Sequence, residues 1–406
     1  MRVIIAVIFV HLLHPAVFSQ SGWFSQTSGT TVPLRSIHFA NENTGWLVGD
    51  LGTIRATSNG GTNWTAQASL TPNVLYSVHF PNVSTGYTVG TFGVIRRTTN
   101  SGATWLIESS ITGNFLLSVF FADAVTGWTV GTGGLIFKTT NQGVNWTFQA
   151  SGTASDLYSV YFINTTTGWA VGDGGTIRTT SNGGANWTSQ TSGTTLPLLS
   201  VQFPSQNSGW VTGALGTIRN TVNFGISWMP QTSGTSNSLN SVYFPVLLTG
   251  WAVGQTGEIL KTTNGGFNWL QQTSGTNDDL TRVFFVNSST GWASGSNGTI
   301  LKTTTGGATS VIQISSEIPK EFSLSQNYPN PFNPQTNIEF AIPRASIVQL
   351  AVYDMLGKGI EILVNEKLNA GIFKTGWNAS VYPSGVYFYK LTSGDFTETK
   401  KMILMK

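Results

Sequence analysis

Two aspartates, Asp156 and Asp173, are the residues of this chain that are best placed for catalytic chemistry. Glycoside hydrolysis usually needs two carboxylates that face each other across the substrate. Residues 21–311 hold nine carboxylates, and these two fall in loops at one end of a single repeat unit. Short acidic residues are also what tight turns select. We therefore predict no catalytic residues, and we keep Asp156 and Asp173 as the alternative.

Positive charges recur at two neighbouring positions of a 41-residue repeat. The first position holds Arg55, Arg96, Arg178 and Arg219, and the second holds Arg97, Lys138, Lys261 and Lys302. Successive residues of a strand point to opposite faces, so the two sets belong to different surfaces. Such a belt can dock an acidic protein or a glycan, or it can be solvated charge without a function. We take the eight residues as candidate binding residues.

No group of residues has the spacing of a metal site. The four histidines, His11, His14, His38 and His79, show no ligand spacing, and the chain has no cysteine. The net charge is +3, and no basic cluster is interleaved with aromatic residues. We therefore predict no metal, no cofactor and no nucleic-acid partner.

The element that must position these side chains is a repeat marked by the dipeptide Gly-Trp. The dipeptide occurs at seven positions 41 residues apart, and the second copy has tyrosine in place of tryptophan. In that copy, alternating strands are expected at residues 75–80, 86–90 and 94–99, and a fourth strand begins at Trp105. Glycines three residues apart, such as Gly90 and Gly93, suit a tight hairpin between the second and third strands. Four antiparallel strands per unit are typical of a β-propeller blade.

The seventh unit lacks its fourth strand, and the N-terminus supplies one. Ser310 stands where the other units have tryptophan, whereas Trp23 lies 41 residues before Trp64. A strand at Trp23 should therefore complete the last blade and close the ring. We predict an all-β chain with a seven-bladed propeller over residues 21–311.

The turn before each fourth strand resembles the Asp-box of BNR repeats, in which a short polar side chain bonds the backbone of its own turn. Asparagine, which can accept the same bonds, replaces the aspartate in six copies, namely Asn59, Asn100, Asn141, Asn182, Asn223 and Asn264. The whole pattern, Thr-Gly-Trp-x-Val-Gly, Gly-Thr-Ile and Thr-x-Asn-Gly-Gly-x-Asn-Trp, resembles the photosystem II assembly factor family. The resemblance implies a seven-bladed propeller that binds protein partners, with surface arginines as the binding patch.

The periodicity stops after Val311, and a second domain follows. Residues 312–321 are predicted to be a linker, and residues 322–406 a small immunoglobulin-like β-sandwich. Three motifs resemble the type A C-terminal sorting domain of the type IX (Por) secretion system: Tyr328-Pro329-Asn330-Pro331-Phe332-Asn333-Pro334, Gly385-Val386-Tyr387 and Lys400-Lys401. The resemblance implies that the type IX machinery is a partner and carries the chain across an outer membrane. An ordinary cell-surface sandwich domain is the alternative.

The N-terminus has the layout of a signal peptide over residues 1–19. Arg2 precedes an apolar run, and the small residue Ser19 marks the cleavage point. His14 and Pro15 interrupt a run that is already too short to span a bilayer, so the mature chain is expected to have no transmembrane segment.

These features predict a secreted or cell-surface binding protein without catalytic activity. The propeller would bind a protein or a glycan, and the C-terminal domain would direct export and surface anchoring. The alternative is a glycoside hydrolase or sialidase-like enzyme that acts on surface polysaccharide.

Overall fold

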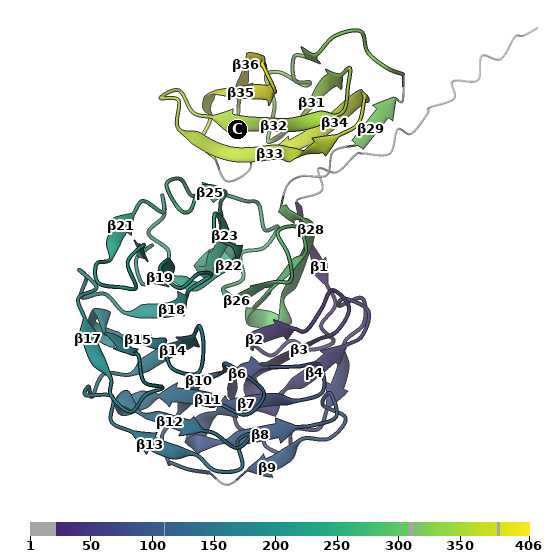
Figure 1. The fold of residues 1–406 in the computed structure, drawn as a ribbon. Helices are drawn as coiled ribbons and strands as arrows, with labels where there is room; N and C mark the ends of the chain where they lie inside the picture. The colour runs from purple at the N-terminus through teal and green to yellow at the C-terminus, as the bar shows by residue number, and fades with distance from the viewer. Residues whose placement is uncertain (1–21, 109, 308–311, 316, 380–381) are drawn as a thin grey trace, which may run out of the picture.

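The computed structural model describes residues 22–108, 110–307, 312–315, 317–379 and 382–406. In these residues the chain forms a ring of sheets, followed by a smaller all-β domain (Figure 1). The predicted signal peptide at residues 1–19 lies outside the described residues.

Seven four-stranded antiparallel sheets form the ring, one for each repeat, so the predicted propeller is confirmed. The innermost strands contact each other around a closed circle; they are β2 (Leu34–Phe39), β6 (Leu75–His79), β10 (Leu116–Phe121), β14 (Leu157–Phe162), β18 (Leu198–Gln202), β22 (Leu239–Val246) and β26 (Leu280–Phe285). The second strands are β3 (Gly45–Gly49), β7 (Gly86–Gly90), β11 (Gly127–Gly131), β15 (Gly168–Gly172), β19 (Gly209–Gly213), β23 (Thr249–Gly254) and β27 (Gly291–Gly295). The third strands are β4 (Ile54–Thr57), β8 (Ile95–Thr98), β12 (Ile136–Thr139), β16 (Ile177–Thr180), β20 (Ile218–Thr221), β24 (Ile259–Thr262) and β28 (Ile300–Gly307). The outer strands of the first six blades are β5 (Thr65–Gln67), β9 (Leu106–Glu108), β13 (Thr147–Gln149), β17 (Thr188–Gln190), β21 (Met229–Gln231) and β25 (Leu270–Gln271).

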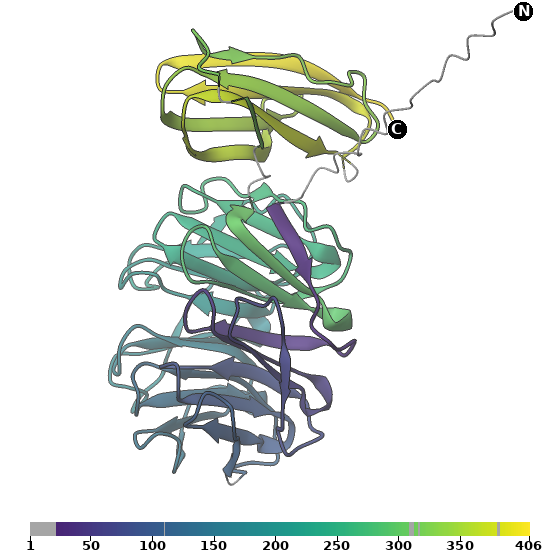
Figure 2. The same ribbon diagram turned by 90° about the vertical axis from the view of Figure 1, so that its right-hand side faces the viewer.

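The seventh blade takes its outer strand from the N-terminus, as the sequence predicted. Strand β1 (Gly22–Gln26) pairs antiparallel with β28, and Gln26 lies opposite Ile300. Figure 2 shows the purple N-terminal strand beside the green strand of the last blade. This pairing closes the ring and covers the outer edge of β28.

The Gly-Trp dipeptide is explained by how neighbouring blades pack. The tryptophan, or Tyr87 in the second blade, stacks on a phenylalanine in the next blade's innermost strand or directly after it, with ring centroids 3.5 to 4.0 Å apart. The glycine lies under the phenylalanine of its own blade, where a Cβ would fall 2.2 to 2.7 Å from the ring. Each blade interface therefore needs glycine and an aromatic residue side by side, and stacked pairs add about 0.5–1.5 kcal/mol each beyond their buried area.

The two glycines that flank each hairpin are required for different reasons. Gly52 has a φ of +65°, a left-handed conformation that favours glycine. Gly49 is extended instead, and its Cβ would lie 2.3 Å from the Pro33 carbonyl oxygen. Thus only the second glycine of the pair serves the positive φ that the sequence suggested for both. Six of these turns are short 3₁₀ segments: η1 (Asp50–Gly52), η2 (Thr91–Gly93), η3 (Thr132–Gly134), η4 (Asp173–Gly175), η5 (Gln255–Gly257) and η6 (Ser296–Gly298).

The asparagine turns hold their own backbone. Asn59 Oδ1 accepts a hydrogen bond from the Asn63 N–H at 2.9 Å and another from the Thr57 hydroxyl at 2.9 Å. The Thr57 hydroxyl in turn accepts from the Gly61 N–H at 2.9 Å. An amide oxygen therefore does here what the aspartate of an Asp-box would do.

The C-terminal domain consists of two four-stranded sheets that share one core around the buried Trp377. One sheet has the order β29 (Ile312–Ser315), β34 (Gly371–Asn378), β31 (Gln335–Ile342) and β30 (Ser323–Leu324). The other has the order β33 (Gly359–Leu368), β32 (Ser346–Tyr353), β35 (Gly385–Ser393) and β36 (Phe396–Leu404). The predicted linker begins too early, because residues 312–315 pair with β34 as an edge strand. A two-sheet sandwich is observed, and its immunoglobulin-like topology stays a prediction.

Candidate functional site

The first set of candidate binding residues joins four blades to the loops that precede them in the chain. Arg55 donates to the Gly29 carbonyl at 2.6 Å, Arg219 donates to the Gly193 carbonyl at 2.5 Å, and Arg178 makes the same bond to Gly152. Arg96 is buried and donates to the carbonyls of Ser69 and Leu70, at 2.8 and 3.2 Å. These four guanidinium groups therefore stabilise loops of the ring. Their role in ligand binding stays a prediction.

The second set lies against tryptophan rings at blade interfaces. The Nζ atoms of Lys138, Lys261 and Lys302 lie 5.1 to 5.3 Å from the ring centroids of Trp128, Trp251 and Trp292. Lys261 also donates to the Gly306 carbonyl, and Lys302 to the Gly60 carbonyl, both at 2.9 Å. Burial lowers the pKa of Lys261 to about 8. The fourth member of this set, Arg97, pairs with Glu108 at 2.7 Å.

Asp156 and Asp173 lie in two loops of the fourth blade, and each carboxylate accepts a hydrogen bond from outside its own turn. Asp156 Oδ1 accepts from the Gly133 N–H at 2.7 Å, and Asp173 Oδ1 accepts from the Tyr158 hydroxyl at 2.8 Å. Burial and the bond to Asp173 together raise the pKa of Tyr158. The bond from Gly133 links Asp156 to the hairpin of the preceding blade, and the bond from Tyr158 links Asp173 to the innermost strand of its own blade.

Other carboxylates on these loops are engaged in the same way. Asp50 holds Arg35 through two bonds of 2.7 and 2.9 Å, and Asp279 accepts from the Thr256 N–H at 2.9 Å. Asp278 accepts from Asn297 at 2.7 Å and from the Thr299 hydroxyl, and these bonds lower its pKa. Within the part of the chain that the structure describes, no three potential ligands gather as a metal site.

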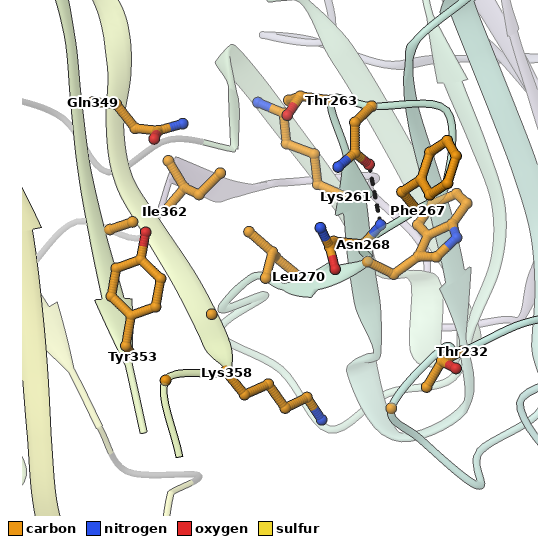
Figure 3. A pocket seen from close by; sticks show the side chains of 16 residues that line it. Thr232, Lys261, Thr263, Phe267, Asn268, Leu270, Gln349, Tyr353, Lys358 and Ile362 are labelled. Atoms are coloured by element: carbon orange, nitrogen blue, oxygen red, sulfur yellow. Dashed lines mark hydrogen bonds between the residues drawn. The ribbon is translucent and has the colours of Figure 1, made fainter. Parts of the chain in front are cut away.

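A cleft of about 400 Å³ lies where the sixth blade meets the C-terminal domain (Figure 3). Lys261, Phe267 and Asn268 line the propeller side, and Tyr353 and Lys358 line the other side. The Phe267 side chain is 89% exposed. Among the described residues that line this cleft, none is a carboxylate.

Local structure holds both walls of the cleft in place. Asn264 Oδ1 accepts from the Asn268 N–H at 3.0 Å, which fixes the turn that presents Phe267 (Figure 3). On the other wall, the Asp354 carboxylate accepts from the Lys358 N–H at 2.9 Å. A Cβ on Gly359 would lie 3.4 Å from Leu270, so the two domains touch at the base of the cleft. Lys261 is the sequence-predicted binding residue that lines this cleft, and the rest of the lining was not predictable because the two walls come from separate domains.

The sorting motif at residues 328–334 is hydrogen-bonded to the end of the C-terminal strand β36. Phe332 is buried, its N–H donates to the Ile403 carbonyl at 3.0 Å, and its carbonyl accepts from the Met405 N–H at 2.9 Å. Asn330 Oδ1 accepts from the Ile403 N–H at 2.9 Å, while Tyr328 is 80% exposed.

The other two sorting motifs pair with each other along β35 and β36. Gly385 and Val386 lie opposite Leu404 and Ile403. The buried Tyr387 donates to the Pro383 carbonyl at 2.7 Å. Lys400 pairs with Glu398 at 3.0 Å, and Lys401 lies opposite Phe388. The three motifs thus converge on the C-terminal strand.

The fold and these motifs define an exported propeller with a sorting tail, and comparison with known families agrees. The chain belongs to the family of photosynthesis system II assembly factor YCF48, whose model matches residues 16–112, 107–198 and 182–277. The model of the secretion system C-terminal sorting domain matches residues 326–405. A search of curated proteins found no match.

Solved structures support the propeller fold. One is described as YCF48 bound to D1 peptide; it is 20% identical, covers 70% of this chain and 98% of its own, and has a TM-score of 0.62. Another, YCF48 from Cyanidioschyzon merolae, is 22% identical, covers 69% of this chain and 98% of its own, and has a TM-score of 0.60. Identities at this level establish a shared fold and no more.

The sorting domain indicates export by type IX secretion to the cell surface or the extracellular space. Among the described residues, no helix has the length and apolar character needed to cross a membrane.

Proposed function

We propose that this chain is a surface or extracellular binding protein without catalytic activity, in which the propeller engages a protein or glycan partner. The observation that carries the proposal is the cleft beside the sixth blade. An aromatic ring that is 89% exposed, Phe267, lines this cleft together with the amide side chain of Asn268 and the side chains of Lys261 and Lys358. Exposed aromatics beside polar donors mark binding surfaces, and the excess of cations selects an acidic ligand.

Two further observations support binding over hydrolysis. Asp156 and Asp173 each accept a hydrogen bond, from the Gly133 N–H and the Tyr158 hydroxyl, which leaves them less available as an acid and a nucleophile. The solved relative described as bound to D1 peptide shows that a propeller of this fold can hold a peptide.

The proposal is tested with the full chain on immobilised alginate, an acidic polysaccharide, and on immobilised poly-L-glutamate. We expect saturable binding to one of the two, and a loss of at least tenfold in affinity for Phe267→Ala. Phe148→Ala is the matched control, because Phe148 is also exposed, on β13, and lies outside the cleft. Binding that Phe267→Ala leaves unchanged would contradict the proposed site.

The same experiment tests the alternative function. Sugar released from alginate is measured beside bound protein, for the wild type and for Asp173→Asn. Release that Asp173→Asn abolishes would make the chain a hydrolase.

A further inference from the structure

The innermost strands carry a ring of serines that links each blade to the next. In six blades the serine Oγ accepts a hydrogen bond from a valine N–H of the following blade, at 3.2 to 3.3 Å. The six serines are Ser36, Ser77, Ser118, Ser159, Ser200 and Ser241. The seventh blade has Arg282 at this position. One blade thus replaces a small neutral acceptor by a cation that cannot accept the bond.

Arg282 faces the channel at the centre of the ring. A cavity of about 190 Å³ lies there, lined by all seven innermost strands. Two columns of side chains in the 41-residue repeat face it, and the more polar column reads His38, His79, Phe120, Tyr161, Gln202, Tyr243 and Phe284. Arg282 is partly buried and lines this cavity. The surrounding strands desolvate the guanidinium and lower its pKa.

The charge of Arg282 is not balanced inside the channel. Among the described residues, none forms a hydrogen bond or an ion pair with its side chain, and no carboxylate lines the cavity. Gln202 is occupied, because both ends of its amide bond the Phe244 backbone, at 2.5 and 3.2 Å. A desolvated cation without a partner opposes folding, and a bound anion would offset that cost.

The other polar groups of the channel are suited to donate. Burial, together with the charge of Arg282, lowers the pKa of His38 to about 3 and also lowers the pKa of His79, so both rings are neutral at pH 7. The two rings lie 5.0 Å apart, and His79 Nδ1 is buried without a partner. A neutral imidazole carries one N–H. That of His38 bonds the Phe80 backbone, whereas that of His79 can be directed at an acceptor. Tyr243 lies near enough to Arg282 for the guanidinium charge to act on its neutral hydroxyl.

We propose that the central channel is a binding site for a small oxyanion, held by the Arg282 guanidinium with His79 and Tyr243 as further donors. A guanidinium binds a carboxylate or a phosphate group through two parallel hydrogen bonds. The site is separate from the cleft beside the sixth blade, so it stands or falls independently of the function proposed above.

The chain offers a clean spectroscopic readout of this site. His38 and His79 are the histidines of the described residues, and both line the channel, whereas His11 and His14 lie in the N-terminal segment. We would titrate the full chain with inorganic phosphate and separately with sodium acetate, at constant pH and ionic strength. The imidazole proton signals are followed by NMR, and the heat of binding by calorimetry.

Arg282→Ser is the decisive variant, because it restores the residue that the other six blades carry and so preserves the fold. Arg344→Ser, which removes an exposed arginine from the C-terminal domain, is the matched control. We expect saturable shifts of the His38 and His79 signals with at least one of the two anions. Affinity should fall at least tenfold in Arg282→Ser and stay unchanged in Arg344→Ser. An absence of saturable shifts with both anions in the wild type, or equal affinity in Arg282→Ser, would overturn the proposal.

Discussion

A buried carboxyl in the C-terminal domain makes that domain's stability depend on pH. Glu361 is 4% exposed, and its Oε2 accepts from Trp377 Nε1 at 2.7 Å. Burial raises the pKa of Glu361 from its ordinary value of 4.5 to about 7, against hydrogen bonds from Trp377, Tyr382 and the propeller residue Thr273 that lower it. Desolvation penalises the ionised form, so the protonated acid is the one that suits the fold.

The direction and size of the effect follow from this pKa. The stabilisation due to protonated Glu361 is complete below pH 4.5 and is lost as the pH rises through about 7. At 1.36 kcal/mol per tenfold change in proton affinity, the loss is about 3 kcal/mol. A local opening that exposes Glu361 should therefore become about 100-fold more populated or more between these two limits.

Hydrogen–deuterium exchange of β33 and β34 in the full chain measures this opening. Protection factors, corrected for the intrinsic exchange rate, are compared at pH 4.5, 6 and 8. We expect the wild type to lose about 100-fold in protection over this range. Glu361→Gln should be nearly flat, because an amide does not titrate and still accepts from Trp377.

Glu339→Gln is the control, because the Glu339 side chain is 44% exposed in its pair with Lys374. It should follow the wild-type profile. A wild-type profile without a pH trend, or the same trend in Glu361→Gln, would show that Glu361 does not titrate in this range.

Three further predictions concern the propeller, and urea denaturation monitored by tryptophan fluorescence measures all of them. Gly45→Ala should destabilise the propeller by about 1–3 kcal/mol, because the added Cβ would lie 2.5 Å from the Phe39 ring. Gly113→Ala is the control and should be close to neutral, since its Cβ would have nothing within 4 Å. Equal effects of the two substitutions would refute the packing argument. Phe203→Ala should lower the free energy of unfolding by about 3–5 kcal/mol, since the Phe203 ring stacks on Trp169 and meets Trp228 edge-on. A loss under about 1 kcal/mol would show that the blade interface repacks. Asn182→Ala should lower the free energy of unfolding by about 0.5–1.5 kcal/mol per lost bond, because the side chain accepts from Thr180 and Asn186. Asn182→Asp should keep both bonds. A larger loss in Asn182→Asp than in Asn182→Ala would contradict the acceptor role.

The sequence was sufficient for features that repeat or that are local. The spacing of the Gly-Trp dipeptide predicted the blades, and Trp23 predicted the closing strand, because each is one residue in a fixed register. The asparagine turns were predictable for the same reason, since their bonds join residues two to four positions apart.

Features that depend on distant segments were not predictable. The partners of Arg55 and Lys302 are carbonyls of other loops, which strand alternation does not reveal. The cleft requires two domains to meet, and β29 is too short to show its own alternation. Arg282 interrupts a column of serines in the repeat, yet only the closed ring shows that this arginine lines a cavity.

The pairing of β1 with β28 also sets the order in which the propeller can assemble. Gly22 lies opposite Gly307, so the contact that completes the circle joins residues 285 positions apart. Contacts this distant in sequence form late, because the intervening chain must first be ordered. Until then the outer edge of β28 has unpaired backbone groups that can pair with a strand of another chain, and the pairing of β1 prevents such aggregation. A truncation that removes β1 therefore acts on the last step of folding, although β1 is synthesised before the other strands of the propeller.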